Sequence, residues 1–126
     1  MASPGDTFIL RGGWQRSPHL WVLLWGPSGP AEAFLAVSFT TLQPHKDQTC
    51  IVQAGEHPFV QHPTCVMYSD TRRITQEKLD AAIASRAAVV MDPLSPELLE
   101  RVRAGLFVSG YSVNSIVAMA REEFGA

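Results

Sequence analysis

The sequence predicts a mainly β chain with C-terminal helices (α+β), in which a small antiparallel β-barrel or sandwich is followed by two or three helices. Over residues 1–75, short apolar runs rich in β-branched and aromatic residues alternate with segments rich in Gly and Pro, a pattern typical of short strands joined by turns. After residue 75, apolar residues recur at helical spacing. A chain of 126 residues has room for one domain with a hydrophobic core. We therefore expect a single domain, with residues 1–75 as the β part and 76–126 as a helical extension packed on it.

Five segments are predicted strands. They are residues 6–10, 19–26, 33–41, 49–53 and 64–68, which read DTFIL, HLWVLLWG, AFLAVSFTT, TCIVQ and TCVMY. The second is apolar on both faces, as expected for a central strand. The GPSGP sequence at its end cannot continue a strand and indicates a tight connection.

Three segments are predicted helices: residues 75–88, 95–105 and 112–124. Thr75 is the expected N-cap of the first. The second has Ser95 at the N-cap position, Pro96 at the first helical position and Gly105 at its expected end.

The apolar stripes of the last two predicted helices are most simply interpreted as core. The alternative is a dimer face or a groove that receives a partner segment. A DNA-reading helix-turn-helix is disfavoured, because the last segment has a single basic residue, Arg121, followed directly by Glu122 and Glu123.

Composition excludes several classes of protein. The formal net charge is −2, and residues 1–75 carry five basic and five acidic residues, whereas a general nucleic-acid binder usually has a basic excess. Any contact with nucleic acid is therefore expected to be local. No apolar run approaches the roughly 20 residues of a membrane helix, and the N-terminus lacks the pattern of an export signal. With two cysteines, these features predict a cytoplasmic protein with free thiols.

The order of segments over residues 5–75 resembles the MazF/PemK and CcdB-like toxins of bacterial toxin–antitoxin pairs. Gly5-Asp6 leads into the first strand, HLWVLLWG forms an apolar second strand, and VSFTT ends in the pair Thr40 and Thr41. The stretch GEHPFVQHPTCVMY is similar to a segment of small growth-inhibitor or plasmid-maintenance toxins. Nuclease members usually begin the second strand with Arg-Pro, whereas this chain reads RSPHLWV, with Arg16 upstream and His19 near the strand start.

The resemblance implies an SH3-like barrel that forms a homodimer, cleaves single-stranded RNA without a cofactor and is silenced by a cognate antitoxin. Two alternatives remain open on the same fold. One is a non-catalytic toxin that binds a target such as gyrase, as CcdB-like proteins do. The other is an inactive barrel that serves as a protein-interaction module.

Metal-independent RNA cleavage needs a base for the 2′-hydroxyl, an acid for the leaving 5′-oxygen, and donors for the charge on phosphorus. His19 is a candidate base or acid, and Thr40 or Thr41 could donate to a phosphate oxygen. The plainer alternatives are a structural hydrogen bond for His19 and ordinary β-propensity for the threonines. A shared groove requires the correct strand register, because a slip of one residue would separate His19 from Thr40.

Candidate RNA-binding residues lie mostly in the loop before the second strand. Arg11 and Arg16 could hold a phosphate through a planar fork, with Arg16 also a candidate catalytic cation, and Trp14 could stack an unpaired base. Arg72 is a further candidate, and its neighbour Arg73 would point to the opposite face of a strand. The alternatives are that the arginines are solvated charges and that Trp14 is an aromatic residue that caps the barrel.

The segment between the last two predicted strands concentrates potential metal ligands: His57, His62 and Cys65, with Cys50 upstream. Their spacing does not match the usual pairing of zinc ligands, and a proline follows each histidine. We therefore predict no metal site, and a structural loop that presents Phe59 to the core. His57 remains a weaker candidate for acid–base chemistry, and the sequence assigns no role to His62.

Overall fold

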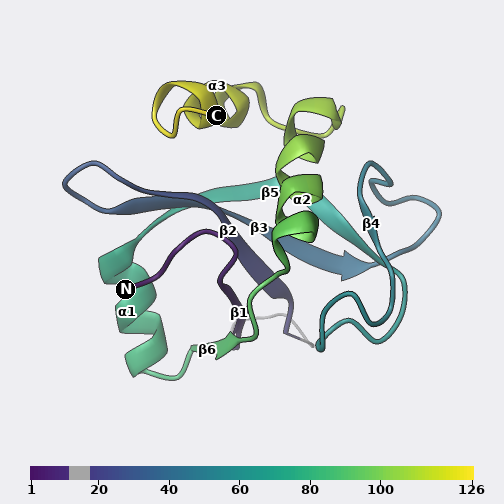
Figure 1. The fold of residues 1–126 in the computed structure, drawn as a ribbon, viewed down its shortest axis with the longest axis horizontal. Helices are drawn as coiled ribbons and strands as arrows, with labels where there is room; N and C mark the ends of the chain where they lie inside the picture. The colour runs from purple at the N-terminus through teal and green to yellow at the C-terminus, as the bar shows by residue number, and fades with distance from the viewer. Residues whose placement is uncertain (12–17) are drawn as a thin grey trace.

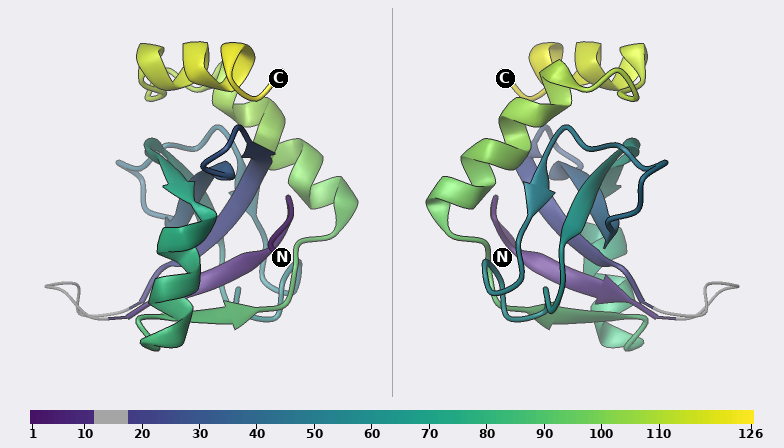
Figure 2. Two further views of the ribbon diagram at one scale, coloured as in Figure 1. Left: turned by 90° about the vertical axis from the view of Figure 1, so that its left-hand side faces the viewer. Right: turned by 90° about the vertical axis from the view of Figure 1, so that its right-hand side faces the viewer.

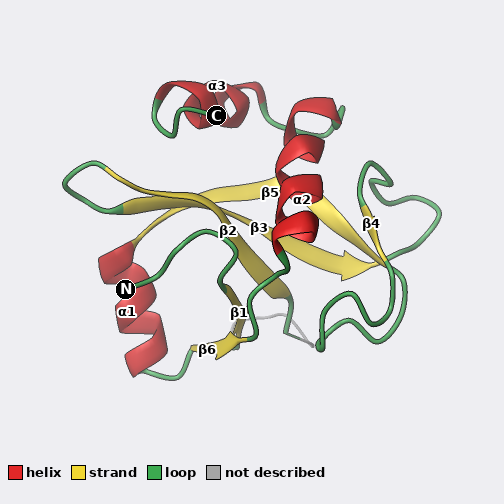
Figure 3. Cartoon of the chain, viewed as in Figure 1, coloured by secondary structure: helices red, strands yellow, loops and turns green. Residues whose placement is uncertain are grey.

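The computed structural model describes residues 1–11 and 18–126, which form six strands and three helices (Figures 1 and 3). The elements are β1 (Thr7–Leu10), β2 (Leu20–Ser28), β3 (Ala33–Thr41), β4 (Ile51–Val52), β5 (Thr64–Thr75), α1 (Gln76–Ala84), β6 (Ala88–Met91), α2 (Pro96–Val108) and α3 (Asn114–Glu122). The predicted fold class, mainly β with C-terminal helices, is confirmed.

All strands pair antiparallel in one sheet with the order β4-β5-β3-β2-β1-β6. The described sheet is open, so the predicted closure into a barrel is not observed. Its edge strands have only two residues (β4) and four residues (β6), which leaves few backbone groups to close it. β5 runs seven residues further than predicted, through Arg72 and Arg73 to Thr75.

The sheet has an apolar layer on each face. The main core lies under α2 and α3 and includes Val22, Val37, Tyr68, Leu98 and Val102. The smaller one lies under α1 and includes Phe8, Trp21, Phe34, Leu79 and Ala88. Accordingly, α1 and α2 lie on opposite sides of the sheet (Figure 2). Burial on both faces explains why β2 and β3 are almost continuously apolar.

The strand β6 was not predicted. Residues 85–88 were assigned to the first helix, but α1 ends at Ala84 and Ser85 caps it, with its N–H bonded to the carbonyl of Ala81. Arg86 then adopts a left-handed backbone with φ of 65°, and the chain returns to pair with β1. Helical periodicity over the preceding residues concealed this reversal.

The predicted helix starts are confirmed. The Thr75 side chain accepts from the N–H of Lys78, and that of Ser95 accepts from the N–H of Leu98. The predicted end of α2 at Gly105 is wrong, because the helix continues to Val108. A Cβ on Gly105 would lie 1.9 Å from the Tyr68 hydroxyl oxygen, so this glycine permits close packing within the helix.

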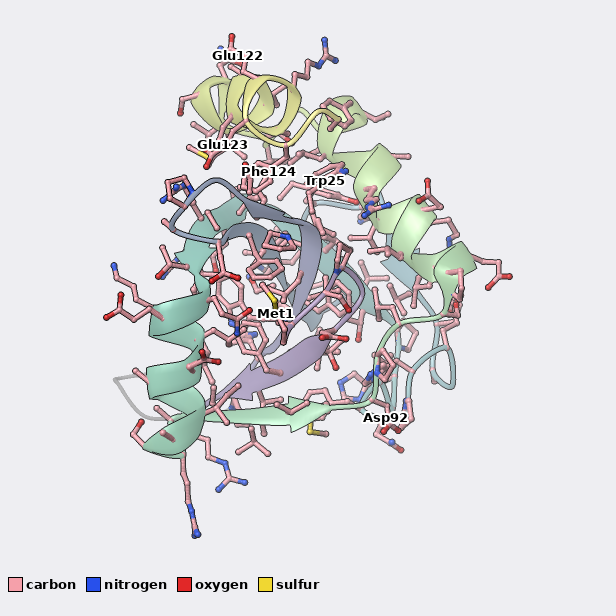
Figure 4. The ribbon with its side chains drawn as sticks, turned by 60° about the vertical axis from the view of Figure 1, so that its left-hand side comes forward. Met1, Trp25, Asp92, Glu122, Glu123 and Phe124 are labelled. Carbon is pink, nitrogen blue, oxygen red and sulfur yellow. The ribbon has the colours of Figure 1, made fainter. Side chains whose placement is uncertain are left out.

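The last helix closes one end of the main core. Ala120 is buried there, and Phe124 packs against the same cluster as Trp25 (Figure 4). The Ser28 hydroxyl donates to the carbonyl of Glu123, whose carboxylate pairs with Arg73. None of the helices in the described ranges is long and apolar enough to cross a membrane.

Candidate functional site

A groove of about 510 Å³ lies where β2 begins and β3 ends. The loop before β5 forms its opposite wall. Its lining residues are Pro18, His19, Leu20, Phe39, Thr40, Thr41, Gln43, Phe59, Val60, Gln61, His62 and Thr64. The groove therefore brings together His19, Thr40 and Thr41, which the sequence singled out.

Strand register accounts for this juxtaposition. Trp21 is the partner of Ser38, so two residues further along this antiparallel pair His19 stands opposite Thr40. On the other side of β3, Thr40 and Thr41 are the partners of Cys65 and Thr64. The slip that would have separated His19 from Thr40 is not present.

His19 is half-buried, and its ring orientation is fixed by the main chain. Its Nδ1 lies 3.0 Å from the carbonyl oxygen of Phe39. A carbonyl can only accept a hydrogen bond, so Nδ1 carries the proton and Nε2 has the free lone pair in the neutral ring. One structural hydrogen bond and an available basic nitrogen thus coexist in the same residue.

Thr41 is tied to a histidine from the facing loop. Its Oγ1 lies 3.2 Å from Nε2 of His62, whose side chain is exposed. The N–H of Leu42 donates to the carbonyl of Pro63 and extends the pairing of the two strands beyond Thr64. Sequence reasoning assigned no role to His62, because its connection to the groove depends on pairing between segments 21 residues apart.

The loop that carries His62 is held at two points. His57 is 2% exposed, donates from Nε2 to the carbonyl of Asp92, and accepts at Nδ1 from the N–H of Phe59. Glu56 pairs with Arg101 on α2, and this guanidinium holds the pKa of the Glu56 carboxyl below its usual value. His57 is therefore a structural residue outside the groove lining, and its candidacy for acid–base chemistry is not supported. Phe59 packs against the main core, as predicted.

The four potential metal ligands of this region do not converge. Cys65 is the partner of Ile51, so the neighbouring Cys50 points to the opposite face of the sheet. Both cysteines are free and buried. Among the residues that the structure describes, no group of three or more His, Cys, Asp or Glu side chains is placed to hold a metal ion.

The two predicted RNA-binding residues that the structure describes, Arg11 and Arg72, do not line the groove. Arg11 is exposed just after β1, where its N–H donates to the carbonyl of Ala87. Arg72 lies further along β5, opposite Ala36, where it pairs with Asp70 and stacks over Trp21 at 5.4 Å. Trp14 and Arg16 fall in residues 12–17, outside the described ranges.

The groove combines a polar rim with an apolar floor. Phe39 and Val60 are buried and Phe59 is half-buried, while threonine, glutamine and histidine supply the polar groups. Within the described lining, His19 and His62 are the only residues with ionisable side chains. None of the lining residues that the structure describes is a carboxylate that would repel a phosphate.

No protein-family model, curated protein or solved structure matches the chain. The residues of the groove are therefore the basis for assigning a function.

Proposed function

We propose that the groove binds single-stranded RNA and cleaves it without a metal ion, through attack of the 2′-hydroxyl on the adjacent phosphorus. One observation carries the proposal: His19, whose Nε2 makes no hydrogen bond to a described residue, lines a groove with Thr40 and Thr41 and no carboxylate among its described residues. A base, hydroxyl donors and tolerance of an anion are among the requirements of this reaction.

In this proposal His19 accepts the proton of the 2′-hydroxyl at Nε2. The bond from Nδ1 to the carbonyl of Phe39 holds the ring in one tautomer, and that carbonyl stabilises the imidazolium that forms. The hydroxyl of Thr40 donates to a non-bridging oxygen as charge develops on phosphorus. The apolar floor around Phe59 accommodates a base that is not paired.

The wider role as a toxin, dimeric and silenced by an antitoxin, follows from the sequence resemblance and is part of the same proposal. In the same proposal, Arg11, directly after β1, and Arg16, further along the chain, attract the RNA backbone. The binding of RNA would then be local, in keeping with a chain whose net charge is −2.

The proposal is tested by induced expression in a bacterial host, with mapping of the 5′ ends of total RNA. Wild-type protein should arrest growth and generate sequence-restricted 5′-hydroxyl ends. The His19→Gln variant should do neither, whereas His45→Gln, at an exposed histidine outside the groove lining, should behave as wild type. Arrest with intact RNA would replace this proposal with the non-catalytic alternative, and no arrest would favour an interaction module.

A further inference from the structure

His62 reaches the groove from the loop before the strand on the other side of β3 from His19. Both β2 and β5 are antiparallel to β3 and flank it, so they start at the same end of the sheet. His19 directly precedes β2, and His62 lies two residues before β5. Both histidines line the same groove of about 510 Å³, which is large enough to hold a phosphate.

The contact with Thr41 defines which nitrogen of His62 is available. Thr41 Oγ1 engages Nε2, and no hydrogen bond links Nδ1 to any residue that the structure describes. In the imidazolium form, Nε2–H donates to Thr41 Oγ1 and Nδ1–H is free to donate to a substrate in the groove. His19 has the opposite arrangement: its Nδ1 is bound, and its Nε2 has no hydrogen-bond partner among the described residues.

From this arrangement we infer that His62 is the second catalytic residue, the general acid that protonates the leaving 5′-oxygen. This inference rests on the proposed RNA cleavage. The 2′-oxygen bonds to phosphorus as its proton passes to Nε2 of His19, and the bond from phosphorus to the 5′-oxygen breaks as that oxygen takes the proton from Nδ1 of His62. The products are a 2′,3′-cyclic phosphate and a 5′-hydroxyl, with no change in oxidation state.

The titratable groups around His62 leave the two histidines to govern the pH dependence. Cys65, on the strand that follows, is buried, which raises the pKa of its thiol and keeps it neutral. Lys46 and Asp47 lie in the loop after β3, and the Asp47 carboxylate accepts from Thr49 and Ser109. A general base and a general acid that act together should give a bell-shaped dependence of the cleavage rate on pH.

The inference is tested with purified protein and a 5′-labelled single-stranded RNA of mixed sequence, in EDTA. We expect His62→Gln to lower the cleavage rate by about 100-fold or more, in the range of a lost general acid, and to abolish the alkaline limb. Thr41→Val should shift the alkaline limb of the rate profile, and Thr41→Ser should return this limb to its wild-type position. His45→Gln is the matched control, and equal thermal unfolding midpoints show that the variants are folded.

A second substrate separates a general acid from a residue that only maintains the groove. In this second RNA, sulfur stands in place of the 5′-bridging oxygen at the linkage that the wild type cuts. The leaving group is then a thiolate, which departs without needing a proton. His62→Gln should cut this substrate at nearly the wild-type rate, while His19→Gln should not.

The outcomes separate the two claims. If the wild type cuts the RNA and His62→Gln cuts it equally, or if sulfur does not rescue a slow His62→Gln, the role of His62 is refuted and RNA cleavage stands. If the wild type cuts no RNA, the proposed function fails and the role of His62 fails with it.

Discussion

The imidazole of His57 donates its Nε2–H to the main-chain carbonyl of Asp92, 35 residues further along the chain. It joins the loop that forms one wall of the groove to the segment between β6 and α2. The same carbonyl also accepts from the Thr7 hydroxyl, so three separate segments meet at Asp92, whose position Figure 4 shows.

We expect His57→Ala to lower the free energy of unfolding by about 1–3 kcal/mol, because the partly buried N–H of Phe59 loses its acceptor and the carbonyl of Asp92 loses a donor. Urea denaturation measures this, with His45→Ala as the exposed control. Cleavage should fall as well, since the wall that carries His62 loses an anchor. Equal stability of the two variants would show that His57 does not hold the loop.

The contact between Gly105 and Tyr68 gives a second prediction. In an exposed helix, Gly→Ala stabilises by about 0.5–1 kcal/mol. At Gly105 the added Cβ would lie 1.9 Å from the Tyr68 hydroxyl oxygen and 2.5 Å from its ring carbon Cζ, so we expect destabilisation of about 1–3 kcal/mol or more. Gly110→Ala is the control, because nothing lies within 4 Å of its Cβ. A more stable Gly105→Ala would contradict the packing of α2 on β5.

Stability should decline in alkaline solution. Burial raises the pKa of the Cys50 thiol and of the Tyr68 phenol above their usual values. Above about pH 8.5, where an unfolded thiol titrates, the unfolded state binds fewer protons than the native state. The free energy of unfolding therefore falls as pH rises.

Urea denaturation at pH 7, 8.5 and 10, with a reducing agent, measures this decline. A Cys50→Ala, Cys65→Ala double variant should decline less steeply, because burial raises the pKa of both thiols. Identical slopes for the two proteins would show that thiol burial does not contribute.

Arg72 should be dispensable for cleavage. It pairs with Asp70 and stacks over Trp21, away from the groove lining. We expect Arg72→Gln to cut RNA at the wild-type rate, to change the fluorescence of Trp21, and to alter stability by less than about 1 kcal/mol, since its side chain is 67% exposed. A loss of cleavage as large as that of His19→Gln would show that Arg72 takes part in the reaction.

Local signals predicted five of the six strands and the starts of the first two helices, because caps and apolar runs act within a few residues. The prediction that GPSGP cannot continue a strand is wrong, because β2 runs through Gly26 and Pro27 to Ser28. Thr75 and Ser95 cap as expected. Tertiary contacts decided the rest: Gly105 continues its helix because Tyr68 packs against it, and β6 exists because β1 offers it a partner.

The same distinction applies to the site. His19, Thr40 and Thr41 could be grouped from the sequence, because consecutive strands joined by a short turn bring their outer ends together. His62 could not, because its contact with Thr41, 21 positions away in the sequence, requires β5 to pair with β3.

The most direct test of the account is digestion of single-stranded RNA by the purified protein in EDTA, with analysis of the new ends. The account predicts 2′,3′-cyclic phosphate and 5′-hydroxyl ends from the wild type and from His45→Gln, and none from His19→Gln. Intact RNA with folded wild-type protein, or equal cleavage by folded His19→Gln, would contradict it.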